Sequence, residues 1–90
     1  MPNRWKVVVP ERFMADLEAI GPDGYDWSAA VAGVKWYLGH DPFKVGYATQ
    51  DLQVRIYFQD RPLGFCGFKV FYLIEDETVT LLRAKAYDTS

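Results

Sequence analysis

Basic and aromatic side chains recur at every second position in the C-terminal half of this 90-residue chain. The runs 52–59, 68–74 and 78–86 are rich in aromatic and β-branched residues, which predicts strands whose successive side chains point to opposite faces. If helices cover one face of these strands, the core positions are Leu52, Val54, Ile56, Val70, Tyr72, Ile74, Leu82 and Ala84. The opposite face then carries Gln53, Arg55, Tyr57, Lys69, Phe71, Arg83, Lys85 and Tyr87. Cations bind phosphates and aromatic rings stack on unpaired bases, so this face has the chemistry of single-stranded RNA recognition.

The same alternation has a simpler interpretation, since Lys and Arg keep the outer face of many antiparallel sheets soluble. The rest of the sequence offers few other reactive groups. His40 has no serine or cysteine with a matching acid that would suggest a catalytic triad, and the sequence contains no paired metal-ligand spacing. We expect Cys66 to be a small core residue and the acidic run 75–77 to be a solvated hairpin turn.

Composition favours one compact folded domain spanning residues 1–90. Half of the residues are apolar and 17% are aromatic, which is too hydrophobic for a disordered chain. The formal net charge is −2, and setting apart Arg55, Lys69, Arg83 and Lys85 leaves −6 for all other residues. Polyanion binding would therefore be confined to a local patch. No apolar run is long enough for a signal peptide or a membrane span, which predicts a cytoplasmic protein without membrane contact.

The N-terminal half reads as a strand followed by two helices. A strand over 5–9 ends at Pro10, which suits the first position of a helix. Apolar residues at helical spacing predict one helix over 11–20 and a second that follows an N-cap at Asp26 or Ser28 and runs to about Leu38, where Gly39 closes it. Because only a few residues join them, these helices should pack as an antiparallel hairpin on one face of a sheet.

The C-terminal half supplies the remaining strands. Residues 39–51 show no sustained period and read as a connection, whereas 52–59 alternates clearly and predicts a half-buried strand. A turn at 60–64 leads into a hairpin of the last two strands. The predicted fold is α+β, in the order β-α-α-β-β-β, with a two-helix hairpin packed on a mainly antiparallel four-stranded sheet.

This order and two sequence features resemble the RelE/ParE toxin superfamily. One feature is the LGHDP sequence at 38–42 with Gly46 after it, and the other is the stretch 67–83. The family pattern of glycine, aromatic, basic, aliphatic, any residue and tyrosine is met there by Gly67, Phe68, Lys69, Val70 and Tyr72. The resemblance covers nearly the whole chain and implies the RelE-like fold.

The resemblance also implies a function. Such proteins are toxins of bacterial type II toxin–antitoxin systems, each neutralised by a cognate antitoxin protein. RelE-like members are mRNA interferases: they cut messenger RNA in the ribosomal A site, without a metal or other cofactor, through attack of a ribose 2′-hydroxyl on the adjacent phosphate.

The residues that would carry this chemistry divide into two groups. By this resemblance Arg55, Lys69 and Arg83 would hold the scissile phosphate, and Tyr87 would stack on a base or transfer a proton. The expected RNA contacts are Gln53, Tyr57, Phe71 and Lys85.

Three alternatives stay open at the level of sequence. ParE-like members of the same superfamily bind DNA gyrase without cleaving RNA, and a protein of this fold could also act only by binding its partner. An unrelated α+β domain could use the same aromatic surface for a small ligand.

Overall fold

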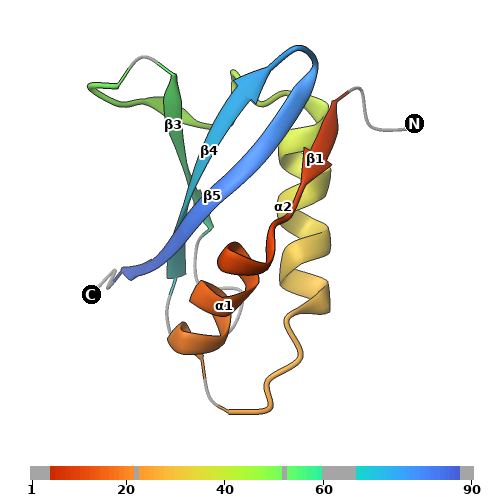
Figure 1. Ribbon diagram of the computed structural model, residues 1–90, viewed down its shortest axis with the longest axis vertical. Helices are drawn as coiled ribbons and strands as arrows, with labels where there is room; N and C mark the ends of the chain where they lie inside the picture. Colours follow the sequence, from red (N-terminus) through yellow and green to blue (C-terminus); the bar gives the residue numbers. More distant parts are fainter. Residues whose placement is uncertain (1–4, 22, 52, 60–66, 88–90) are drawn as a thin grey trace.

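The computed structural model describes residues 5–21, 23–51, 53–59 and 67–87 (Figure 1). Two helices pack on a five-stranded mixed sheet, an α+β arrangement in the predicted order with one additional strand. The elements are β1 (Lys6–Val8), α1 (Glu11–Ile20), α2 (Ser28–His40), β2 (Tyr47–Ala48), β3 (Val54–Gln59), β4 (Gly67–Glu75) and β5 (Thr78–Tyr87).

Helix α1 has the predicted bounds. Pro10, which was expected at the first helical position, is instead the N-cap residue before it, and the N–H of Gly21 donates to the carbonyl of Leu17 (3.2 Å) at the end of the helix. Phe13 and Leu17 are fully buried. The helical spacing of the apolar residues therefore identified the face that enters the core.

Helix α2 begins at Ser28, whose backbone N–H and hydroxyl both donate to Asp26 Oδ1 (2.9 and 2.6 Å). These two bonds hold the pKa of Asp26 below its usual range. The helix continues to His40, so the prediction that Gly39 closes it was wrong. Gly39 is buried inside the helix, and its carbonyl accepts the N–H of Trp5 (2.9 Å), which ties the start of β1 to α2. The chain descends along α1 and returns along α2 (Figure 1), and neither helix is long enough to cross a bilayer.

The strand order is β1-β5-β4-β3-β2. β1 lies parallel to β5, and the other pairs are antiparallel. The fifth strand, β2, pairs Tyr47 with Ile56 and Ala48 with Arg55 inside the segment that the sequence analysis read as a connection. Two residues are too few to show a period, so the sequence carried no signal for this strand.

The hairpin between β4 and β5 turns at Asp76 and Glu77, as predicted. Both residues have positive φ (47° and 63°), which is the two-residue turn geometry whose twist matches that of the flanking strands. Glu75 pairs with Thr78 directly before and after this turn. The turn thereby fixes which side chains of the two strands lie opposite each other as far as Tyr72 and Leu81.

The face of the sheet that packs against the helices is the core face. Phe68, Val70, Tyr72 and Ala84 are buried there, together with Val79 and Leu81 and with Val34 and Leu38 of α2. Val70, Tyr72 and Ala84 match the prediction, and Ile74 packs partly buried against the same cluster.

The predicted faces of β3 are reversed in the structure. Arg55 lies opposite Tyr72 and Tyr57 lies opposite Val70, so both are on the core face, while Val54, Ile56 and Phe58 are on the other face. Because side chains alternate with a period of two, choosing the wrong parity inverts every position of a strand. The polar ends of the two inward residues find partners: Arg55 Nη2 donates to backbone carbonyls, although Arg55 Nε is buried without a hydrogen-bond partner among the described residues, and the Tyr57 hydroxyl donates to Gln59 Oε1 (2.6 Å). Their apolar parts can therefore be buried.

A β-bulge in β5 corrects a second prediction. Phe71 pairs with Arg83 and the next residue, Tyr72, pairs with Leu81, so Leu82 is an extra residue without a direct partner. Leu81 is fully buried and Leu82 is only partly so. Leu52 and Cys66, which were predicted to be core residues, lie outside the described residues.

Candidate nucleic-acid interface

The face of the sheet opposite the helices, called the open face below, gathers basic and aromatic side chains from four strands. Its register places these residues together: Tyr47 of β2, Ile56 and Phe58 of β3, Lys69, Phe71 and Leu73 of β4, and Arg83, Lys85 and Tyr87 of β5. Within the predicted site, Lys69, Phe71, Lys85 and Tyr87 are therefore brought onto one surface.

Two lysines form the cationic centre of the open face. Lys69 and Lys85 are direct cross-strand partners, which places their Cα atoms about 5 Å apart. Among the described residues no carboxylate forms an ion pair with either ammonium. Lys85 Nζ lies 5.9 Å from the centre of the Phe71 ring, within cation–π range. Two like charges in this position repel each other, and an anion bound between them would relieve the repulsion.

Three aromatic rings, called the aromatic row below, run beside the two lysines. The Phe58 ring lies 5.8 Å from that of Tyr47 and 5.6 Å from that of Tyr87, measured between ring centres, and both contacts are edge-to-face. Phe58 is also the direct cross-strand partner of Lys69. The aromatic row and the two lysines therefore lie side by side on one surface.

The Tyr87 ring is seated over Gly67. A Cβ atom at Gly67 would lie 2.7 Å from Tyr87 Cζ and 2.8 Å from the Gln59 carbonyl oxygen, so a side chain there would displace the ring. The Tyr87 hydroxyl donates to that same carbonyl (3.4 Å). The glycine that opens the family-like pattern at 67–72 therefore has a physical role in placing Tyr87.

Arg83 belongs to the open face by register, but its guanidinium reaches the edge of the sheet. Nε and Nη2 donate to the two carboxylate oxygens of Asp16 on α1 (2.7 and 3.0 Å). Asp16 also accepts the backbone N–H of Ala84 (2.9 Å). The Arg83 contact, aided by the Ala84 bond, holds the pKa of Asp16 below its usual range, and the same contact raises the pKa of Arg83.

Arg55 lies on the core face and holds a loop. Its Nη2 donates to the carbonyls of Phe43 (2.8 Å) and Gly46 (3.1 Å), and its guanidinium lies 5.7 Å from the centre of the Phe43 ring. The neighbouring Tyr72 hydroxyl donates to the Pro42 carbonyl (2.5 Å). These contacts fasten residues 42–46 to the sheet, and β2 follows immediately.

Tyr57 and Gln53 also lie apart from the open face. Tyr57 is buried beside Tyr37, with 6.1 Å between ring centres, and burial, aided by Tyr37 and Tyr87, raises its pKa to about 12. Gln53 precedes β3, and its backbone N–H donates to Asp51 Oδ1 (3.1 Å) in a turn. The sequence analysis expected Gln53 and Tyr57 to contact RNA because it placed them on the exposed face of this strand. The structure reverses the two faces of β3.

Sequence reasoning missed Tyr47 and Phe58. Phe58 alternates with polar neighbours and was read as part of the apolar face of its strand, and Tyr47 falls in the segment read as a connection. An alternating pattern shows that a strand has two different faces without showing which one the helices cover, so the sequence held no signal that could have corrected this.

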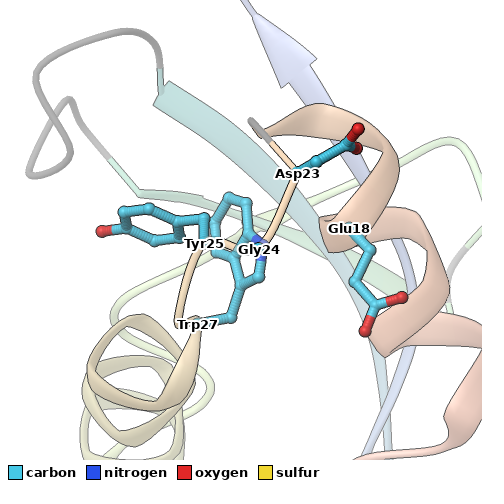
Figure 2. Close-up of a pocket in the computed structure, with 5 residues that line it drawn as sticks. All are labelled: Glu18, Asp23, Gly24, Tyr25 and Trp27. Atoms are coloured by element: carbon cyan, nitrogen blue, oxygen red, sulfur yellow. The ribbon is translucent and has the colours of Figure 1, made fainter.

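The described residues also form a shallow hollow where α1 leads into α2 (Figure 2). Its volume is about 240 Å³, and its lining residues are Glu18, Asp23, Gly24, Tyr25 and Trp27. The Trp27 ring is part of the core and packs edge-to-face on Tyr25 and on Phe68 (4.9 and 6.0 Å between ring centres). The described part of the chain has no group of three His, Cys, Asp or Glu side chains able to hold a metal ion. The hollow is therefore explained by the packing of the Trp27 ring against its neighbours.

Two solved structures share this architecture, while no protein-family model and no curated sequence matches the chain. A copper-bound mutant toxin from Helicobacter pylori is 19% identical, with a TM-score of 0.54 and coverage of 92% of this chain and 94% of that one. A conserved hypothetical protein from the same organism is 20% identical, with a TM-score of 0.52 and the same coverage. The fold is RelE-like. The resemblance seen in the sequence is therefore confirmed for the fold, which is what a likeness at this level of identity establishes.

Proposed function

We propose that this protein is the toxin of a bacterial type II toxin–antitoxin system and acts as a ribosome-dependent messenger RNA endoribonuclease. The supporting observation is the pairing of Lys69 and Lys85 on the open face, beside the aromatic row and without a carboxylate partner among the described residues. The RelE-like fold and the toxin among its structural neighbours support the same proposal.

In the proposed reaction a ribose 2′-oxygen forms a bond to the adjacent phosphorus, and the bond from phosphorus to the 5′-oxygen of the next nucleotide breaks. The proton leaves the 2′-hydroxyl, and another proton reaches the departing 5′-oxygen. The products are a 2′,3′-cyclic phosphate and a 5′-hydroxyl. The step adds negative charge to the phosphate oxygens, which the ammonium groups of Lys69 and Lys85 would stabilise.

We assign phosphate binding to Lys69 and Lys85, and base stacking or proton transfer to Tyr87. Arg83 would take part by exchanging Asp16 for a phosphate, since its guanidinium already presents two N–H groups to a carboxylate. Arg55 would act indirectly, by holding the loop that precedes β2. Tyr57 is not assigned to proton transfer because it lies on the core face, on the other side of the sheet from Lys69 and Lys85.

The proposal includes an antitoxin partner that covers the open face and keeps the toxin inactive while it is bound. A DNA gyrase inhibitor of the same fold is the second candidate. It is favoured because Arg55 and Arg83 both form hydrogen bonds to other groups of the protein, so fewer cations are available for RNA than the sequence suggested.

The test is induction of the protein in growing bacteria, with the ends of messenger RNA mapped by primer extension. We expect cuts that require ongoing translation, and we expect Lys69→Ala to reduce them about 100-fold or more, the usual cost of losing a group that stabilises developing charge. Lys35→Ala, an exposed lysine of α2 on the far side of the sheet, is the matched control and should cut normally. Intact messages together with a DNA-damage response would favour the gyrase alternative. Undiminished cutting by Lys69→Ala would remove this residue from the site.

A further inference from the structure

Tyr47 and Phe58 are exposed to an unusual degree for large aromatic residues on strands. Their side chains are 66% and 43% exposed, although both lie within the sheet. They add little to the core, which consists of residues from the other face. Aromatic rings held on a rigid sheet and left open to solvent are typical of a surface that receives a ligand.

The position of these rings points to a particular ligand. Phe58 lies directly across from Lys69, and Lys85 lies one strand further on. Neighbouring strands are about 5 Å apart, so a phosphate between the two ammonium groups would have its adjoining nucleotide over the Phe58 ring. Tyr47, whose ring contacts Phe58 at 5.8 Å, extends the platform towards the edge of the sheet. A phosphate site adjoining a pair of rings fits an unpaired nucleotide chain, because every base offers a flat face for stacking.

We infer that Tyr47 and Phe58 form a base-stacking subsite for the nucleotide beside the scissile phosphate, and that this subsite favours purines. The inference rests on the proposed function and deepens it by naming residues that position the substrate. The preference follows from stacking strength, which is the source of modest sequence preferences on aromatic platforms without hydrogen-bond readout. Phe58 has no hydrogen-bonding group and Tyr47 has only its hydroxyl, so the two side chains would recognise a base mainly through its flat face.

The experiment measures single-turnover cutting of messenger RNA on programmed bacterial ribosomes by the purified protein. Two messages differ only in having a purine or a pyrimidine at the position beside the cut. We expect Tyr47→Leu and Phe58→Leu each to slow cutting of the purine message about 5- to 100-fold, as expected for loss of one base–aromatic stack. Both substitutions should also reduce the difference between the two messages, an effect that a general loss of stability would not produce.

Trp36→Leu is the matched control, because Trp36 is a similarly exposed aromatic residue (54%) on α2 and away from the open face. It should cut both messages as the unaltered protein does. If Phe58→Leu lowers the melting temperature, the result for Tyr47→Leu decides the test, because Tyr47 is the more exposed of the two residues.

The outcomes separate the inference from the proposed function. If the unaltered protein cuts, Lys69→Ala does not, and both ring variants cut with an unchanged preference, then the stacking subsite is wrong and the proposed function stands. If the unaltered protein does not cut on ribosomes, the proposed function fails and the subsite with it. If the ring variants cut normally but no longer bind the antitoxin, the rings serve a protein partner and the inference is overturned.

Discussion

Removing the carboxylate of Asp16 tests how α1 holds the free edge of β5. β1 pairs with β5 only at Thr78 to Thr80, so the N–H of Ala84 depends on Asp16 as its acceptor. We expect Asp16→Ala to lower the free energy of unfolding by about 1–2 kcal/mol, the usual cost of leaving a partly buried amide without its charged acceptor. Loss of the Arg83 contact should add little, because the Arg83 side chain is 54% exposed and solvent screens the pair.

The effect should depend on pH in a defined direction. The Arg83 and Ala84 contacts hold the pKa of Asp16 below its ordinary value of 3.8, so the unfolded chain binds the proton more readily than the folded protein does. Stability contributed by the ionised carboxylate is therefore fully present above that ordinary value and is lost as pH falls through the lowered one. The difference in unfolding free energy between the unaltered protein and Asp16→Asn should be constant near neutral pH and shrink below about pH 4.

Urea and thermal unfolding, followed by circular dichroism at several pH values, measure these differences. For a domain of this size 1 kcal/mol corresponds to a shift of about 4–8 °C in melting temperature. Asp16→Asn retains an acceptor for Ala84 and should lose less than Asp16→Ala, and Glu18→Ala, an exposed acid of the same helix, should stay within about 0.5 kcal/mol. The reasoning fails if Asp16→Ala is as stable as the unaltered protein, or if the Asp16→Asn difference is the same at pH 3 and pH 7.

Two further predictions concern backbone positions. Gly46→Ala should destabilise the protein by several kcal/mol or prevent folding, since a Cβ atom there would overlap the Tyr72 hydroxyl and approach the Ile56 carbonyl to 2.9 Å. Gly33→Ala, inside α2 with no atom within 4 Å of the added carbon, should instead stabilise it by about 0.5–1 kcal/mol; equal effects of the two substitutions in urea unfolding would contradict this view of Gly46. Glu77→Gly should raise the free energy of unfolding by about 1 kcal/mol, because Glu77 has a φ of 63° that costs a side-chain-bearing residue roughly this amount. Glu75→Gly, at a strand position without that strain, should lower it by about 0.5–1 kcal/mol, and a stabilising effect there would show that the gain at Glu77 has another cause.

The sequence was most informative where a local signal decides the structure. Pro10 and Gly21 flank a helix whose bounds were predicted to the residue, and the acidic turn was placed correctly between β4 and β5. The parity of β3 could not be predicted, because Arg55 and Tyr57 have apolar parts that can be buried and polar ends that find partners inside the protein. The bulge at Leu82 was equally hidden, since two adjacent leucines at 81–82 fit either register.

The residues of the candidate site also differ in how well the sequence predicted them. The alternation of apolar residues within each strand placed Lys69 and Phe71, and Lys85 and Tyr87, on the outer face. The bulge at Leu82 brings the two pairs onto the same face, because the register of the turn, continued without it, would set Lys85 opposite Phe68 on the core face. In β3 the alternation was assigned to the wrong face, and β2 is too short to show an alternation. For this reason the sequence supplied the cations of the site but not two of its three rings.

The parallel pairing of β1 with β5 has a consequence for how the protein folds during its synthesis. Lys6 pairs with Thr78, so the sheet is closed at this edge by segments near opposite ends of the chain. Chains fold from the N-terminus during synthesis, but β1 has no partner strand until β5 has been made. The open face needs β5 as well, because Lys85 and Tyr87 lie on it. The surface proposed to attack ribosome-bound messages is therefore assembled only after β5 has been made.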